Sequence, residues 1–350
     1  MTMRSLTGLA AASAIALVAA TGVVGCASVA TAAQEQPQQS EAVAELFDYL
    51  DDHNTTGFVV LRNGEVVLQR NWAAPRDDRM FANFVYGTTD DGQLLEDVAS
   101  QQKSFVAVLI AIAVDRGLID IEAPVSTYLG EGWSRASRQQ EAAIRVIDIM
   151  TMSSGLNEQF GYVAPAGTTF FYNTPVYAVS KRIVAEAAGQ PLDVITREWL
   201  TGPVGMSQTA WRRRPAALAS VGNDTGLVTT PMDVARFGQM ILNGGVTEDG
   251  TRVVSEAQLQ ALFTRSDTNP AYGRLWWLNG GSHTVRAAGA QIPGPLIPAA
   301  PADTVAALGA FDRRLYVAPS QGLVVVRTGA ATNDAAFDQQ LWLRLNAALD

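Results

Sequence analysis

The sequence predicts an α+β fold in which an antiparallel sheet, built from N- and C-terminal segments, carries an inserted all-helical lobe. Strand patterns occur near the N-terminus and again in the last third of the chain, and helical spacing fills the region between them. The flanking segments 40–53 and 335–349 have helical spacing and are expected to cover the sheet as terminal helices. With 350 residues, 48% of them hydrophobic and 17% charged, the chain can bury a large core.

The first 25 residues predict a targeting segment. Arg4 supplies a positive charge, an apolar stretch follows, and residues 23–26 (Val-Val-Gly-Cys) resemble the box of a lipoprotein signal peptide. This resemblance implies cleavage before Cys26, the only cysteine, and lipidation of its thiol. The alternative is ordinary secretion with cleavage after Ala32. The expected location is therefore the cell envelope, lipid-anchored on the periplasmic face of a membrane or secreted, with residues 26–40 as a flexible tether.

The sheet is expected to begin with a hairpin. Residues 56–62 and 65–70 have strand character, and Asn63-Gly64 between them favours a type I′ turn. The remaining strands are expected at 305–309, 314–317 and 322–327. The hydrolase domain, residues 41–350, then divides into a sheet lobe of about 41–95 and 265–350 and a helical lobe of about 96–264.

Several helices of the inserted lobe have recognisable ends. The apolar run 104–114 predicts a buried helix that stops at Arg116-Gly117 and is too short to cross a bilayer. Thr174 and Thr230 each precede a proline, a pattern that predicts helices with threonine as the N-cap. Further helices are expected at 142–152 and 254–263.

Ser100 and Lys103 lie three residues apart at the start of the buried helix, so their side chains share one face of its first turn. A helix N-terminus offers free N–H groups and a positive field to a developing oxyanion. The chain contains 23 arginines but only two lysines, Lys103 and Lys181. Because arginine does not release its proton in proteins, Lys103 is interpreted as an amine base for a serine nucleophile. The alternative is a capping serine beside a solvated lysine.

Four segments resemble motifs of the serine β-lactamase and penicillin-binding-protein superfamily. They are Ser100-Gln-Gln-Lys103, residues 145–156, Tyr172 and residues 231–238, in the family's order. The resemblance covers most of residues 41–350 and is strongest to the β-lactamase-related serine hydrolases near class C, which include esterases and 6-aminohexanoate-dimer hydrolases. It implies a β-lactamase-like fold with Ser100 as nucleophile, Lys103 as its base and Tyr172 as the proton relay to the leaving group.

The chain departs from the family at the motif Tyr-x-Asn, where it has Tyr172-Asn173-Thr174. Two alternatives remain open: Thr174 occupies the third position, or Asn173 is displaced into it and binds substrate. The family's Lys-Thr-Gly strand is also altered, and Ala307-Leu308-Gly309 is its expected counterpart.

Gly309 still allows close backbone approach, and the N–H of Ala310 is expected to complete an oxyanion hole with that of Ser100. The altered strand has no cation to bind the carboxylate of β-lactams and cell-wall peptides, unless Arg313 or Arg314 supplies one. The expected activity is therefore hydrolysis of a small ester, amide or peptide through an acyl-enzyme and without a cofactor. The alternatives are β-lactamase or D,D-peptidase activity and an inactive envelope binding protein of the same fold.

Other chemistries have little support in the sequence. A Ser-His-Asp triad would need His53 or His283, and no G-x-S-x-G elbow is present. No cluster of Cys or His favours a metal, and a net charge of −9 without a basic run argues against nucleic acid as a partner. Trp276, Trp277 and the proline-rich loop 291–301 are candidates for lining or covering the cleft.

Overall fold

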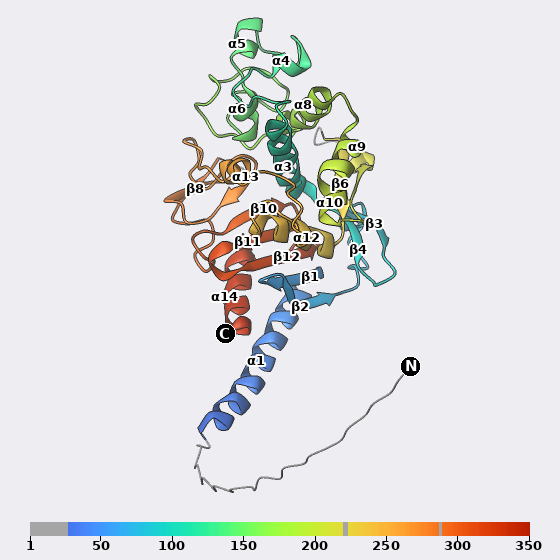
Figure 1. The fold of residues 1–350 in the computed structure, drawn as a ribbon, viewed down its shortest axis with the longest axis vertical. Coiled ribbons are helices and arrows are strands. Elements are labelled where there is room, and N and C mark those ends of the chain that lie inside the picture. Colours follow the sequence, from blue (N-terminus) through green and yellow to red (C-terminus); the bar gives the residue numbers. More distant parts are fainter. Residues whose placement is uncertain (1–26, 220–222, 287–288) are drawn as a thin grey trace, which may run out of the picture.

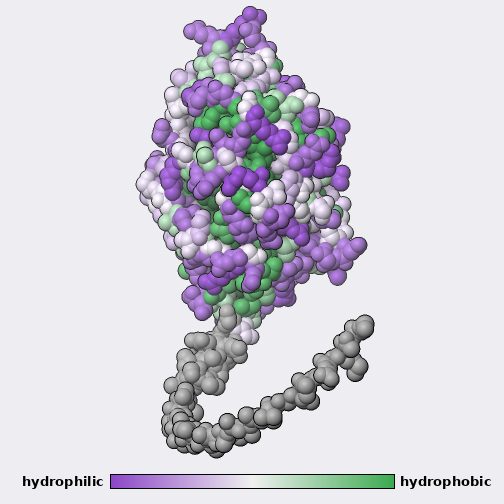
Figure 2. All heavy atoms as spheres, in the orientation of Figure 1, coloured by the Kyte–Doolittle hydropathy of each residue, from purple (hydrophilic) through white to green (hydrophobic). Residues whose placement is uncertain are grey.

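The computed structural model describes residues 27–219, 223–286 and 289–350, with the backbone alone for 27–39. The predicted signal peptide and Cys26 lie outside these ranges. Figure 1 shows an elongated molecule with α4, α5, α6 and α8 at one end, sheets in the middle, and α1 and α14 at the other end. On the face drawn in Figure 2, hydrophobic side chains come to the surface only in patches between polar ones.

The main sheet has the strand order β2-β1-β12-β11-β10-β7, and its neighbouring strands are antiparallel. Its strands are β1 (Thr55–Arg62), β2 (Glu65–Asn71), β7 (Trp277–Leu278), β10 (Val305–Gly309), β11 (Arg313–Ala318) and β12 (Leu323–Gly329). The N-terminal hairpin therefore pairs with the C-terminal strand, which confirms the predicted fold class. Asn63 and Gly64 both have positive φ, as a type I′ turn requires.

Helices cover both faces of this sheet. On one face α1 (Ala27–Asp52) packs beside α14 (Phe337–Leu349). On the other face α12 (Pro231–Leu242) packs against β1, β11 and β12. The alternation along β11 shows that these are opposite faces: the ring of Tyr316 meets Trp342 of α14, whereas its neighbour Leu315 approaches Gly238 of α12.

The segment predicted to be a tether is helical from Ala27 onward, as the first part of α1. Its many alanines and glutamines have high helix propensity, which the prediction underweighted. In the middle of the molecule α3 (Gln102–Asp115) is buried along almost its whole length, as the apolar run predicts. It packs against α8 (Val179–Ala188), α13 (Glu256–Leu262) and β10.

Strands at 210–213 and 225–229 lie within the predicted helical lobe of about 96–264, so the prediction of an all-helical lobe is wrong. A second antiparallel sheet, with the order β3-β4-β6-β5, consists of β3 (Val85–Thr88), β4 (Leu94–Asp97), β5 (Ala210–Arg213) and β6 (Thr225–Thr229). These strands are too short to show a clear period, and β4 pairs with a segment far along the chain. A separate hairpin joins β8 (His283–Val285) to β9 (Gln291–Pro293).

The other helices are short: α2 (Arg79–Ala82), α4 (Ser126–Leu129), α5 (Arg138–Ala142), α6 (Val146–Met150), α7 (Thr174–Tyr177), α9 (Leu192–Thr196), α10 (Gly202–Val204) and α11 (Ala216–Ala219). Thr230 caps α12, as predicted. The N-cap of α7 is Asn173, one residue before the predicted cap. Within the described ranges, no helix combines the length and apolarity needed to cross a membrane.

Candidate active site

Ser100 lies in a short 3-10 helix, Ala99–Gln101, that leads directly into α3. Ala99 has a φ of 50°, in the left-handed region that costs an alanine about 1 kcal/mol or more. Asp97, at the end of β4, accepts a hydrogen bond from the Ala99 N–H at 2.8 Å. The same buried carboxylate binds Arg214 at 2.6 and 2.9 Å. This ion pair therefore fixes the strained turn that presents Ser100.

The amine of Lys103 lies beside the Ser100 hydroxyl. Its Nζ is 2.8 Å from Ser100 Oγ and 3.2 Å from Thr174 Oγ1. The side chain is 2% exposed, and Nζ lies 4.8 Å from the ring centres of both Tyr172 and Tyr177. Serine and lysine are thus within one hydrogen bond of each other, as their spacing on the helix predicts.

Burial lowers the pKa of Lys103 well below its ordinary value of 10.5, and the positive charges of Arg214 and Lys181 lower it further. The two tyrosine rings act in the opposite direction, because the face of an aromatic ring attracts a cation by about 0.5–2 kcal/mol. Burying an ammonium costs several kcal/mol even after relaxation. Desolvation therefore dominates, and the site favours the neutral amine that a general base requires.

Tyr172 precedes α7 and is held by aromatic neighbours. Its ring stacks on Trp277 at 5.8 Å and meets Tyr272 edge-on at 6.2 Å. Burial raises the pKa of Tyr172 to about 12, against the opposing effect of its hydrogen bond with Ser100. The phenol consequently keeps its proton at neutral pH. Of the two tryptophans considered for the cleft, Trp277 supports Tyr172, whereas Trp276 is fully buried in the core.

Thr174, not Asn173, faces the amine of Lys103. The Asn173 side chain is buried and caps α7: its Oδ1 accepts the Val176 N–H at 3.1 Å, and its Nδ2 donates to Leu156 O at 2.9 Å. Both ends of this amide are therefore occupied within the protein, which argues against the predicted contact with substrate. The sequence did not decide between them because Asn173 and Thr174 are adjacent and both have polar side chains.

A cavity of about 350 Å³ opens beside Ser100. It is lined by Met80, Phe84, Ala99, Ser100, Gln102, Thr174, Arg214, Ala217, Leu218, Asn223, Ala310 and Phe311. Most of these side chains are apolar. Within the described ranges, Arg214 is the one charged residue of the lining, and its guanidinium is bound to Asp97 and to the backbone oxygen of Asn223.

The end of β10 lies against the turn that carries Ser100. Gln101 Nε2 donates to the backbone oxygen of Ala307 at 3.3 Å. A Cβ at position 309 would clash with the backbone oxygen of Val98, so the close approach needs the glycine present there. Gly309 is therefore next to the turn, and Ala310 lines the cavity with Ser100, the arrangement that the predicted oxyanion hole requires.

Neither arginine near this strand supplies the missing cation. Arg313 is fully buried, and its Nη2 lies 2.9 Å from Glu96 Oε2. Arg314 is bound to Asp338 at 2.6 Å and to Asp312 at 2.7 Å. Both guanidiniums are neutralised by carboxylates, and neither residue lines the Ser100 cavity.

The remaining candidates lie elsewhere. His53 packs against the rings of Tyr49 and Phe337, and His283, the first residue of β8, lies beside Ser282. The proline-rich loop does not line the cavity, because Asn279 binds the backbone of Ile297, Ala300 and Pro301 and holds the loop. Among the side chains described, no group of three or more His, Cys, Asp and Glu is placed to bind a metal.

Sequence reasoning missed the ion pair between Asp97 and Arg214 and the apolar wall at Phe84, Leu218 and Phe311. Asp97 stands three residues before Ser100, which was the one available signal. The partners come from segments far along the chain, so no local pattern pointed to them.

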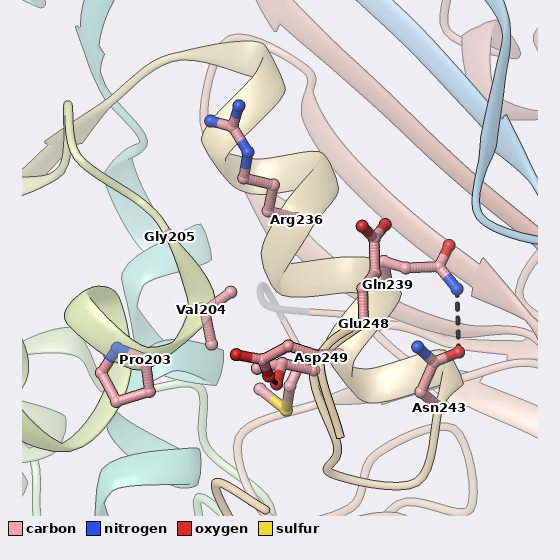
Figure 3. Close-up of a pocket in the computed structure, with 10 residues that line it drawn as sticks. Pro203, Val204, Gly205, Arg236, Gln239, Asn243, Glu248 and Asp249 are labelled. Carbon is pink, nitrogen blue, oxygen red and sulfur yellow. Dashed lines mark hydrogen bonds between the residues drawn. The ribbon is translucent and has the colours of Figure 1, made fainter. Parts of the chain in front are cut away.

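A second cavity, of about 250 Å³, lies between α10 and α12. Figure 3 shows Pro203, Val204 and Gly205 on one side of it, Gln239 of α12 bonded to the C-cap residue Asn243, and the acidic side chains Glu248 and Asp249. It shares no lining residue with the Ser100 cavity. None of its side chains is paired as nucleophile and base, so the catalytic candidate remains the cavity beside Ser100.

Comparison with known proteins shows the family. The chain is 26% identical over 292 aligned positions to the 6-aminohexanoate-dimer hydrolase of Paenarthrobacter ureafaciens, with 67% of each chain covered. It is 26% identical over 204 positions to penicillin-binding protein 4 of Amycolatopsis lactamdurans, of which it spans about half, 53%, with 45% of this chain covered.

Solved structures share the fold at lower identity. The beta-lactamase/D-alanine carboxypeptidase of Yersinia pestis superposes with a TM-score of 0.63 at 16% identity, over 90% of this chain and 98% of that one. A class C beta-lactamase gives a TM-score of 0.66 at 15% identity, over 89% and 96%. The model of the beta-lactamase family matches residues 43–349. The chain therefore belongs to the beta-lactamase family.

Proposed function

We propose that this member of a serine hydrolase family cleaves a short, uncharged ester or amide through an acyl-enzyme on Ser100. The observation that carries the proposal is the 2.8 Å approach of a buried lysine amine to the Ser100 hydroxyl. A serine hydroxyl is a weak nucleophile unless a base removes its proton as it attacks. Lys103 supplies that base.

The opposite pKa shifts of two residues support Lys103 as the base and Tyr172 as the acid. The pKa of Lys103 is lowered, so its amine accepts a proton; the pKa of Tyr172 is raised to about 12, so its phenol donates one. Ser100 Oγ attacks the carbonyl carbon while Lys103 takes the hydroxyl proton. The bond to the leaving group then breaks as Tyr172 protonates that group and is reprotonated from Lys103.

Water completes the cycle. It attacks the carbonyl of the acyl-enzyme as Lys103 takes its proton. The acyl–Oγ bond then breaks as Lys103 returns that proton to Ser100 Oγ, which releases the acid product and restores the free serine. The N–H groups of Ser100 and Ala310 stabilise the oxyanion in both halves, a contribution of about 3–4 kcal/mol where such a donor has been removed in other hydrolases. Gly309 supports this arrangement through the close approach of β10 to the turn.

The cavity favours an uncharged acyl group. Its wall contains Phe84, Leu218 and Phe311, and the guanidinium of Arg214 is already paired with Asp97. A substrate carboxylate would lose its hydration here without gaining a free cation. A charge-assisted hydrogen bond typically contributes about 1.5–3 kcal/mol, so its absence corresponds to about 10–100-fold.

We therefore expect the enzyme to hydrolyse p-nitrophenyl butyrate with a kcat/KM about 10–100-fold above that for p-nitrophenyl hydrogen succinate. The two esters match in length and leaving group and differ in one carboxylate. A chromogenic cephalosporin, which also carries a carboxylate, is expected to react more slowly than the neutral ester. Faster cleavage of the cephalosporin supports β-lactamase activity instead, and the absence of turnover with all three supports a binding protein.

The proposed location is the cell envelope, with the mature chain anchored through a lipid on Cys26. We expect the intact mass to begin at Cys26 and to include acyl chains, and Cys26→Ser to move the protein from the membrane fraction to the soluble fraction. Two or more acyl chains are needed for stable anchoring, so the wild-type protein should remain in the membrane at high salt. An unmodified N-terminus after Ala32 would contradict the anchor.

A further inference from the structure

Lys181, the second of the two lysines, has no part in the proposed reaction yet is 7% exposed. Its Nζ lies 3.4 Å from Gln102 Oε1 and 3.0 Å from both the backbone oxygen and Oγ1 of Thr225, and it also binds Asn223 Oδ1. All four contacts are with oxygen atoms of uncharged groups. A buried amine within hydrogen-bond distance of four such acceptors, for at most three N–H groups, links α8, Gln102 and the segment 223–225.

The contact with Gln102 leads to the nucleophile. Gln102 is 1% exposed, and its Nε2 donates to the backbone oxygen of Ala99 at 2.9 Å. Ala99 is the strained residue that precedes Ser100. Because the oxygen end of the Gln102 amide faces Lys181, the nitrogen end is oriented toward the turn. Lys181 thus acts on the turn through one intermediate side chain.

The contacts with Asn223 and Thr225 lead to the cavity wall. Asn223 lines the cavity, and its backbone oxygen accepts a hydrogen bond from Arg214 at 3.1 Å. Thr225 begins β6, the strand that pairs with β4 just before the turn. The ring of Trp211, on β5, lies 4.9 Å from Lys181 Nζ on another side.

The charge on Lys181 faces several ionisable groups. Burial lowers the pKa of Lys181 to about 7; the nearby Arg214 lowers it as well, whereas Asp224 and Asp97 raise it. The charge of Lys181 in turn lowers the pKa of Lys103. Protonated Lys181 therefore favours the neutral form of the base.

We propose that Lys181 is a positioning residue: bound to Gln102, Asn223 and Thr225, it holds the turn and the cavity wall and places a positive charge within electrostatic reach of Lys103. The inference rests on the proposed role of Lys103 as base. It also explains why a chain that otherwise uses arginine has its second lysine here. The compact ammonium meets acceptors on several sides, whereas a planar guanidinium suits a carboxylate.

We expect Lys181→Met to lower kcat/KM about 10–100-fold, because small displacements of catalytic groups have effects of this size. Its distinguishing effect is on the pH profile. Without the neighbouring charge Lys103 holds its proton more tightly, so the acid limb of kcat/KM should move to higher pH. Lys181→Arg, which retains the charge, should keep the limb near its wild-type position. Arg182→Met, an exposed neighbour on α8, is the matched control and should not move it.

A second measurement needs neither turnover nor a folded Lys181→Met. Protein labelled with [ε-¹³C]lysine gives two NMR resonances, one for each lysine, whose shifts can be followed as the pH changes. The Ser100→Ala protein can be titrated in the same way. Coupling predicts a second inflection in the Lys103 signal at the pH where Lys181 titrates. An acid limb that stays in place in folded Lys181→Met, or a single-step Lys103 titration, overturns the proposal. A failure of the proposed function itself would be recognised separately, because wild type and Ser100→Ala would then have equal turnover.

Discussion

Ser100→Ala is expected to lower kcat/KM for p-nitrophenyl butyrate by about 10⁴-fold or more, the scale on which serine hydrolases lose activity when the nucleophile is removed. Lys103, Tyr172 and the oxyanion donors remain, but no acyl-enzyme forms. Wild-type protein should also gain the mass of a fluorophosphonate on the peptide that contains Ser100, and Ser100→Ala should not. Labelling separates an active hydrolase from an inactive relative that only binds.

Ser104→Ala is the matched control. Ser104 lies one turn further along α3, and its hydroxyl donates to the backbone oxygen of Leu275 at 2.8 Å. The variant loses a buried hydrogen bond, about 1 kcal/mol of stability, but should keep the label and most of the activity. Turnover at the wild-type rate by Ser100→Ala would show that another residue is the nucleophile.

Lys103→Arg is expected to lose about 10²–10⁴-fold in kcat/KM although it preserves the formal charge. The site needs an amine that releases its proton, and arginine stays protonated. Lys103→Met, of similar length and without charge, should be comparably inactive. Lys103 is only 2% exposed, so the larger guanidinium of arginine could destabilise the fold. Measured unfolding temperatures of the two variants therefore separate lost catalysis from lost folding.

The wild-type pH profile tests the same assignment. Because the pKa of Lys103 is lowered, activity should rise as the pH passes upward through a value well below 10.5. It should fall again only as the pH approaches the value of about 12 for Tyr172, where the phenol loses its proton. A fully active Lys103→Arg enzyme, or an acid limb at the ordinary lysine value, would indicate that Lys103 contributes charge alone.

The sequence was sufficient for features that local spacing encodes. The hairpin at Asn63-Gly64 follows from the turn preference of two residues, and the buried helix after Ser100 from an apolar run with charges at its ends. The spacing of Ser100 and Lys103 likewise places both groups on one helical turn. In each case neighbours along the chain are also neighbours in space.

The order of the motifs also predicted the family and the fold class. The match of residues 43–349 to the beta-lactamase family agrees with that resemblance. The four-stranded sheet, to which the inserted lobe contributes β5 and β6, escaped prediction because its strands are short and β4 pairs with a strand far along the chain. The roles assigned to Ser100, Lys103 and Tyr172 remain predictions for the experiments above.

Only the tertiary structure distinguished residues with similar local patterns. Asn173 and Thr174 are adjacent polar residues, and the capping of α7 directs one inward while the other meets Lys103. Arg313 and Arg214 look alike in sequence, yet one is buried against Glu96 and the other lines the cavity paired with Asp97. Side-chain partners, burial and pKa shifts arise from contacts between distant segments, so spacing along the chain identified the reactive groups and the fold determined their surroundings.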